Sequence, residues 1–73
     1  MEYTIYIMEK IRDLISKYAG MNEISEVELC IPKDTYVDVD ELISNFKSLY
    51  NINVKVVSRN CPNLKVIAIS VED

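Results

Sequence analysis

Two cysteines are the residues of this chain best suited to chemistry. Cys30 ends a stretch of alternating apolar residues, and Cys61 lies in the turn-forming run Asn-Cys-Pro-Asn at 60–63. Cysteines of intracellular proteins are usually reduced, so we interpret both as structural thiols. A disulfide between them and a metal site remain open alternatives, since thiolates also bind soft metal ions. The acidic side chains that could complete such a metal site are Glu26, Glu28 and Asp34.

The rest of the sequence offers little for catalysis. It contains no histidine, which removes the commonest general base near neutral pH and the commonest metal ligand. The acidic residues Asp38, Asp40 and Glu41 are explained by the start of a helix rather than by a cation site. Glu2, together with the N-terminal amine, is a further candidate for metal binding. We therefore expect no enzyme, and the metal candidates are Glu2, Cys30 and Cys61.

The composition predicts one small globular domain over residues 1–73. Hydrophobic residues make up 49% of the chain, with one glycine and two prolines, which favours a compact fold over disorder. The net charge of -4 argues against a non-specific nucleic-acid binder, which needs clustered Lys and Arg. The longest apolar runs, such as 5–8 and 66–69, are too short to span a membrane, and no secretory signal is visible. We expect a cytoplasmic protein that binds neither nucleic acid nor membranes.

The clearest structural signal is a helix that begins after Asp38 and ends near residue 50. Asp38 is suited to the N-cap, and Glu41 follows three residues later, the spacing of a capping box. Asn51 can end the helix in a left-handed conformation. Apolar residues recur at helical spacing and predict one buried stripe, which consists of Val39, Leu42, Ile43, Phe46, Leu49 and Tyr50.

The other elements are predicted with less local information. Residues 4–19 favour a first helix, with Thr4 as its N-cap and Gly20 as its C-terminal cap. A short strand over residues 3–7 followed by a shorter helix is the alternative. Apolar patterns predict strands over 27–31, 52–56 and 64–71. The last strand is apolar without a break over 66–69, which is typical of a strand buried on both faces.

This order of elements predicts an α+β fold of two layers, with the order α-β-α-β-β and a three-stranded mixed sheet. The first two strands should be parallel because a helix joins them, and the second and third should form a hairpin. Placing the doubly apolar third strand in the middle gives the strand order 2-3-1, with both helices on one face. Val66 and Ala68 then face the helices. The opposite face is our predicted interaction surface, which consists of Val57, Ile67, Ile69 and Val71 with Lys55 and Lys65.

The spacing of the apolar residues resembles that of a known family. The pattern Val27-x-Leu29-x-Ile31, then Val37-Asp38-x-Asp40-x-Leu42, then Phe46-x-x-Leu49 and a strand is similar to the nickel-binding domain of the hydrogenase nickel-insertion accessory proteins. These small metallochaperones also serve urease in some bacteria. The resemblance spans nearly the whole chain, and it implies the same order of helices and strands and a role in carrying nickel.

The chain departs from that family at both of its metal sites. The family binds nickel through the N-terminal amine, backbone nitrogens and a histidine directly after the initiator methionine, where this chain has Glu2. The family's zinc domain, with two Cys-x-x-Cys pairs, is replaced here by residues 59–63. The resemblance therefore implies a shortened relative that keeps the shape and the partner surface, and it excludes zinc binding by the family's route.

Together these observations predict a small non-catalytic protein-interaction or accessory domain. We expect it to bind a protein partner or a second copy of itself through the exposed sheet face, without a cofactor. One alternative is a metal-carrying maturation factor that binds nickel through its N-terminus or its cysteines. Another is a small acidic inhibitor or mimic of the type that viruses encode.

Overall fold

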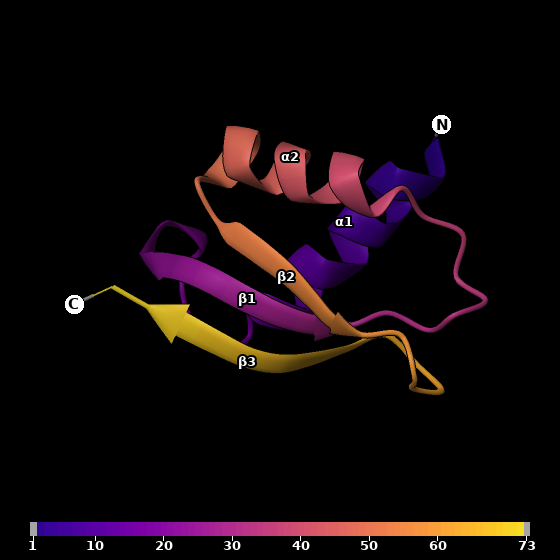
Figure 1. Cartoon of the computed structure of the whole chain (residues 1–73). Coiled ribbons are helices and arrows are strands. Elements are labelled where there is room, and N and C mark those ends of the chain that lie inside the picture. Colours follow the sequence, from indigo (N-terminus) through magenta and orange to yellow (C-terminus); the bar gives the residue numbers. More distant parts are fainter. Residues whose placement is uncertain (1, 73) are drawn as a thin grey trace.

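The computed structural model describes residues 2–72 of the chain and the side chains of residues 4–72. Its elements are α1 (Glu2–Ile15), the short 3-10 helix η1 (Met21–Glu23), β1 (Ile24–Cys30), α2 (Val39–Tyr50), β2 (Asn53–Ser58) and β3 (Lys65–Val71). Both α-helices lie on the same face of the three-stranded sheet (Figure 1). The predicted α+β fold class, its two layers and the order α-β-α-β-β are confirmed.

The ends of α2 are set by the residues that the sequence predicts. The Asp38 carboxylate accepts a hydrogen bond from the Glu41 N–H at 3.1 Å, which satisfies one of the amide groups that a helix start leaves without a partner. Asn51 ends the helix in the left-handed conformation, with φ of 57°. Its N–H donates to the Lys47 carbonyl oxygen at 3.0 Å. Both predicted caps are therefore confirmed.

The apolar stripe of α2 is only partly buried. Leu42 and Phe46 are fully buried under the helix. Leu49, which the helical spacing places in the core, is instead 66% exposed. It lies near the end of α2 and lines an open groove between the two helices, so it does not reach the sheet.

α1 begins and ends earlier than the predicted helix over 4–19. The alternative strand over 3–7 is wrong, and Thr4 lies buried inside the helix rather than at its cap. The helix ends in a turn in which the Tyr18 N–H donates to the Ile15 carbonyl oxygen at 3.0 Å. Gly20 does not cap α1, since its φ is -64°, and its N–H donates instead to Glu23 Oε1 at 3.0 Å, at the start of η1.

β1 is the central strand, which corrects the predicted strand order 2-3-1. The observed order is β2-β1-β3, with β1 parallel to β2 and antiparallel to β3. The parallel pairing of the first two strands is confirmed, and the predicted hairpin between the second and third is wrong. The apolar run of β3 predicts a strand buried on both faces, but its residues are half-buried or exposed. The fully buried residues are Val27 and Leu29 of β1. A central β1 also aligns its Glu28 with Lys55 of β2, an opposite-charge pair.

A bulge in β3 decides which of its residues face the helices. Val27 aligns with Ile69 and Leu29 with Val66, so β3 has one more residue than β1 over this stretch. Val66 and Ile69 therefore both pack against the core, whereas Ala68 is exposed. The predictions that Ile69 lies on the open face and that Ala68 faces the helices are wrong, because strict alternation does not allow for the extra residue.

Two leucines of α2 test this description of the core. Leu42→Ala removes a fully buried side chain and leaves a cavity, so we expect the free energy of unfolding to fall by about 2–5 kcal/mol. Leu49→Ala makes the same change in the same helix at an exposed position and should cost ~0.5 kcal/mol or less. Urea denaturation of the two variants measures the difference. Equal losses would show that Leu49 is buried in solution.

Candidate functional site

The residues predicted as an interaction surface do not form one patch. They divide between the two edge strands, with Lys55 and Val57 on β2 and Lys65, Ile67, Ile69 and Val71 on β3. β1 lies between the two groups and carries Glu26 and Glu28. Ile69 packs against the core and contributes little to the surface. The structure therefore does not bring the six residues together.

The open face of the sheet has a charged centre. Glu26 Oε1 of β1 lies 3.8 Å from Lys55 Nζ of β2. Glu28 aligns with Lys55 on one side and with Ala68 of β3 on the other. The Lys55 side chain is well exposed, so this ion pair adds little to stability. The carboxylates do, however, interrupt the apolar surface, so the face as a whole is a poor apolar docking surface.

Exposed apolar side chains instead gather along the outer edge of β3. An open groove of about 380 Å³ lies there, beside the segment that follows α1. Its large exposed side chains are Tyr18, Ile67 and Val71, which are 73%, 47% and 53% exposed. We call this site the β3 edge groove, and its lining residues are Tyr18, Val66, Ile67, Ala68, Ile69 and Val71. Tyr18 lies within the helix predicted over 4–19, and it is available at this edge because α1 ends at Ile15.

The backbone along the outer edge of β3 is available for another strand. The Glu72 N–H donates to the Glu23 carbonyl oxygen at 2.8 Å, and the Ser70 carbonyl oxygen accepts a serine hydroxyl from β1 at 3.2 Å. Both groups therefore point toward β1. Backbone groups of neighbouring residues alternate in direction along a strand, so those of Ile69 and Val71 point to the open edge. This edge can form the hydrogen bonds that hold a sheet together.

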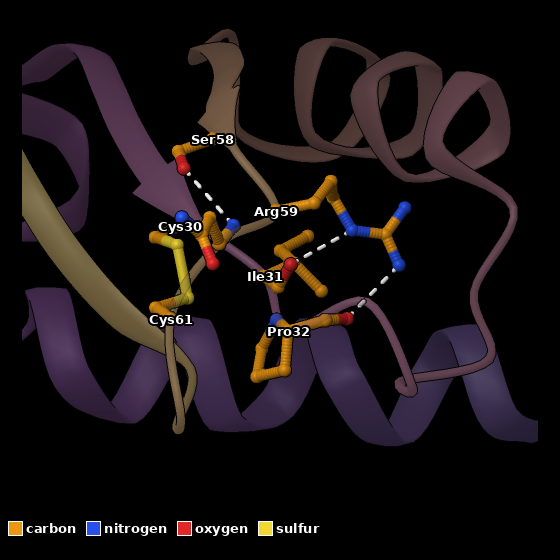
Figure 2. The surroundings of a disulfide bond; sticks show 7 residues. Cys30, Ile31, Pro32, Ser58, Arg59 and Cys61 are labelled. Carbon is orange, nitrogen blue, oxygen red and sulfur yellow. Dashed lines mark hydrogen bonds between the residues drawn. A yellow bond between two sulfur atoms is a disulfide. The ribbon is translucent and has the colours of Figure 1, made fainter.

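Cys30 and Cys61 form a disulfide bond, with their Cα atoms 6.4 Å apart (Figure 2). The interpretation of both residues as reduced thiols is wrong. They meet because β1 and β2 are parallel, so the end of β1 and the residues after β2 lie at the same end of the sheet. The bond joins residues 31 positions apart, and restricting the unfolded chain to that extent stabilises the fold by about 3–4 kcal/mol. For a chain of this size that is a large share of the total stability.

Arg59 joins the same two segments through hydrogen bonds. Its Nε donates to the Ile31 carbonyl oxygen at 2.7 Å, and one terminal guanidinium nitrogen donates to the carbonyl oxygens of Pro32 and Thr35, each at 3.0 Å. Figure 2 shows the first two of these bonds beside the disulfide. A guanidinium has enough donors, in a fixed plane, to bind three carbonyl groups at once. The sequence gives no sign that Arg59 binds these carbonyl groups, because an isolated arginine belongs to no pattern that would identify its partners.

Metal ligands do not gather in the part of the chain that the structure describes. Residues 4–72 contain no group of three or more His, Cys, Asp or Glu side chains that could hold a metal ion. Cys30 and Cys61 are joined to each other, so they offer no thiolate. The remaining metal-binding candidates are the Glu2 side chain and the N-terminal amine, and both lie outside the part of the chain that the structure describes.

A second groove lies between α1 and α2 and is more polar than the β3 edge groove. It contains the exposed apolar side chains of Ile5 and Leu49, but also Glu9 and Arg12. A side-chain hydrogen bond with Tyr50 raises the pKa of Arg12, which is charged at any physiological pH in either case. This contact links the two helices.

A function for this chain has to be proposed from the geometry of its own structure. No protein-family model, curated protein or solved structure matches this chain. Within the described residues, no helix has both the length and the apolar character needed to cross a membrane.

Arg59 offers a test of the contacts around the disulfide. Arg59→Lys keeps the positive charge but cannot bind three carbonyl groups, so we expect the free energy of unfolding to fall by about 1–3 kcal/mol. Amide exchange at the Thr35 N–H, which bonds to the Pro32 carbonyl oxygen, should become faster. Lys33→Ala, an exposed change in the same loop, is the control and should alter neither quantity. Unchanged exchange in Arg59→Lys would contradict the three bonds.

Proposed function

We propose that this chain is a non-catalytic protein-interaction domain that acts through the edge of β3, and that its partner there is a second copy of itself. The observation that carries the proposal is the β3 edge groove, where outward-pointing backbone groups lie beside exposed apolar side chains. Open strand edges of this kind accept an additional strand. Main-chain hydrogen bonds then provide affinity, and the neighbouring side chains provide specificity.

The two edges of the sheet differ in their protection against pairing. Proteins protect edge strands with charged residues, prolines and bulges. β2 carries Asn53 and Lys55 within the strand, whereas the charged residue of β3 is Lys65 at its start. The bulge at Ile67 disturbs the first half of β3, but residues 68–70 follow β1 without interruption. The second half of β3 is therefore the part best suited to pairing.

The charges at the two ends of β3 favour a second copy in the antiparallel orientation. Lys65 precedes the apolar part of the strand and Glu72 follows it. Antiparallel pairing of two β3 strands around Ile69 places Lys65 of each copy at the acidic end of the other strand, one position along from Glu72, and opposite charges at neighbouring strand ends are favourable. Parallel pairing would bring like charges together. The antiparallel contact has two-fold symmetry, so the same surface is used on both copies and the assembly closes as a dimer.

The size of this contact predicts a weak and reversible dimer. Stable interfaces bury ~800 Å² on each partner and involve roughly 20–30 residues a side. β3 has seven residues, so a contact made through this one edge strand falls well below that size. We therefore expect a dissociation constant in the micromolar range or weaker, which is measurable at the concentrations used for sedimentation and NMR.

Two valines in similar settings test the role of the β3 edge. Val71 of β3 is 53% exposed and Val57 of β2 is 50% exposed. Val71→Lys places a charge in the proposed interface and should raise the dimer dissociation constant about tenfold or more, the equivalent of ~1.4 kcal/mol. Val57→Lys changes the net charge equally on the other edge and should leave dimerisation unchanged. Sedimentation velocity over a concentration series measures both, and a wild-type protein that stays monomeric at millimolar concentration would refute the proposal.

A charge exchange tests the orientation of the two strands. Lys65→Glu should weaken the dimer, because it places acidic side chains from both copies side by side. The double variant Lys65→Glu/Glu72→Lys restores opposite charges and should regain most of the lost affinity, with a salt dependence like that of the wild type. If the double variant is weaker than the single one, the antiparallel arrangement is wrong.

A further inference from the structure

We infer that the Cys30–Cys61 disulfide is a redox control of the β3 edge. In the oxidised protein it fixes the chain that leads into β3, and reduction by a dithiol compound or a dithiol protein releases that chain and the first residues of the strand. The effect on pairing rests on the function proposed above. The effect on the structure does not, so the two can be tested separately.

The connection between β2 and β3 makes this control possible. The two strands lie on opposite sides of β1, so residues 59–64, which we call the 59–64 connection, pass across the end of β1 (Figure 1). Its first part is held by the Arg59 hydrogen bonds and by the Asn60 N–H, which donates to Ser58 Oγ at 3.0 Å. Its last part packs Leu64 partly against the core. Between them, the disulfide at Cys61 is the covalent attachment to the sheet.

The disulfide is attached at the point of β1 where β3 begins. Cys30 aligns with Lys65, the first residue of β3, in the antiparallel register. Cys61 therefore lies just before the strand and is bonded to the β1 residue that the strand meets first. Without that bond, no covalent link holds the chain that leads into Lys65 and Val66. The bulge directly after these two residues also makes their pairing with β1 irregular. We expect this segment to open locally while the rest of β3 stays paired.

The exposure of the two cysteines favours attack at Cys61. Cys30 is 2% exposed, whereas Cys61 is partly exposed. A thiolate of the reductant attacks Cys61 Sγ, the bond between the two cysteine sulfurs breaks, and Cys30 Sγ leaves as a thiolate that takes up a proton. The second thiol of the reductant then attacks the mixed disulfide and displaces Cys61 Sγ, which is also protonated. The reductant leaves as a disulfide, and the protein has gained two electrons and two protons.

The rest of the fold does not depend on the bond in the same way. Cys30 is buried in the apolar core, whereas Cys61 is only partly buried, and the other core side chains of the helices and the sheet pack together without the bond. A buried thiol packs like a small apolar side chain, so Cys30 can remain in place after reduction. The Arg59 hydrogen bonds to the loop after β1 also remain. Reduction should therefore lower stability and loosen the 59–64 connection without unfolding the sheet.

The experiment compares the oxidised protein with the same protein held in excess dithiothreitol. Hydrogen exchange followed by NMR should show amides over residues 62–67 exchanging about tenfold faster or more after reduction. The amides of Val27 and Leu29 report the lower global stability, and they should remain better protected than residues 62–67 in both redox states. Sedimentation velocity on the same samples should show the dimer dissociation constant rising about tenfold. The double variant Cys30→Ala/Cys61→Ala should match the reduced protein and should not respond to dithiothreitol, which controls for other effects of the reductant.

Each other outcome has a definite meaning. Equal exchange over 62–67 in the two redox states overturns the inference, whatever the dimer does. Complete loss of protection throughout the sheet overturns it as well, because the reduced chain would then be unfolded rather than opened locally. Faster local exchange with an unchanged dimer overturns the link to pairing. Absence of a dimer in the oxidised protein refutes the proposed function, and the exchange result still decides the structural part. These readings come from the wild-type protein and stand even if the double variant fails to fold.

Discussion

β1 has a strand on each side and both helices over one face, so Val27 and Leu29 are fully buried while Glu26 and Glu28 remain on the opposite face. The two other strands both pair with this strand. α2 and β2 follow it in a parallel unit, and β3 reaches its other side only by crossing its end. That crossing is where the disulfide forms. The charged face of β1 also confines exposed apolar surface to the edges of the sheet, since carboxylates in a central strand separate the two groups of apolar residues.

Local signals in the sequence predicted the ends of α2 but not those of α1, and they did not predict features that depend on contacts between distant residues. The caps of α2 at Asp38 and Asn51 were predicted because each acts within a few residues along the chain. The strand order was predicted wrongly, because an apolar run like that of β3 is compatible with a central strand and with an edge strand beside a groove. Leu49 shows the same limit, since helical spacing gives the face of a helix but not how far that face is covered.

The candidate site could be predicted in part. The sequence pointed to β3, and Ile67 and Val71 are indeed exposed there. It could not reveal Tyr18, which joins the site only because α1 ends early, nor the bulge that turns Ile69 toward the core. The parallel pairing of the first two strands, which the sequence predicted, brings the two cysteines together, but the choice between thiols and a disulfide depended on an assumed cellular compartment.

The difference between the two edges of the sheet also affects how readily the chain could aggregate. A strand that can pair on one side only cannot support continuous growth, because a two-fold contact uses the available edge of both molecules. The opposite edge is β2, which carries Lys55, and a charged residue on an edge strand disfavours pairing with another strand. A substitution that made β2 as apolar as β3 would give the sheet two edges that can accept a strand, and such a chain could grow into aggregates instead of stopping at the proposed dimer.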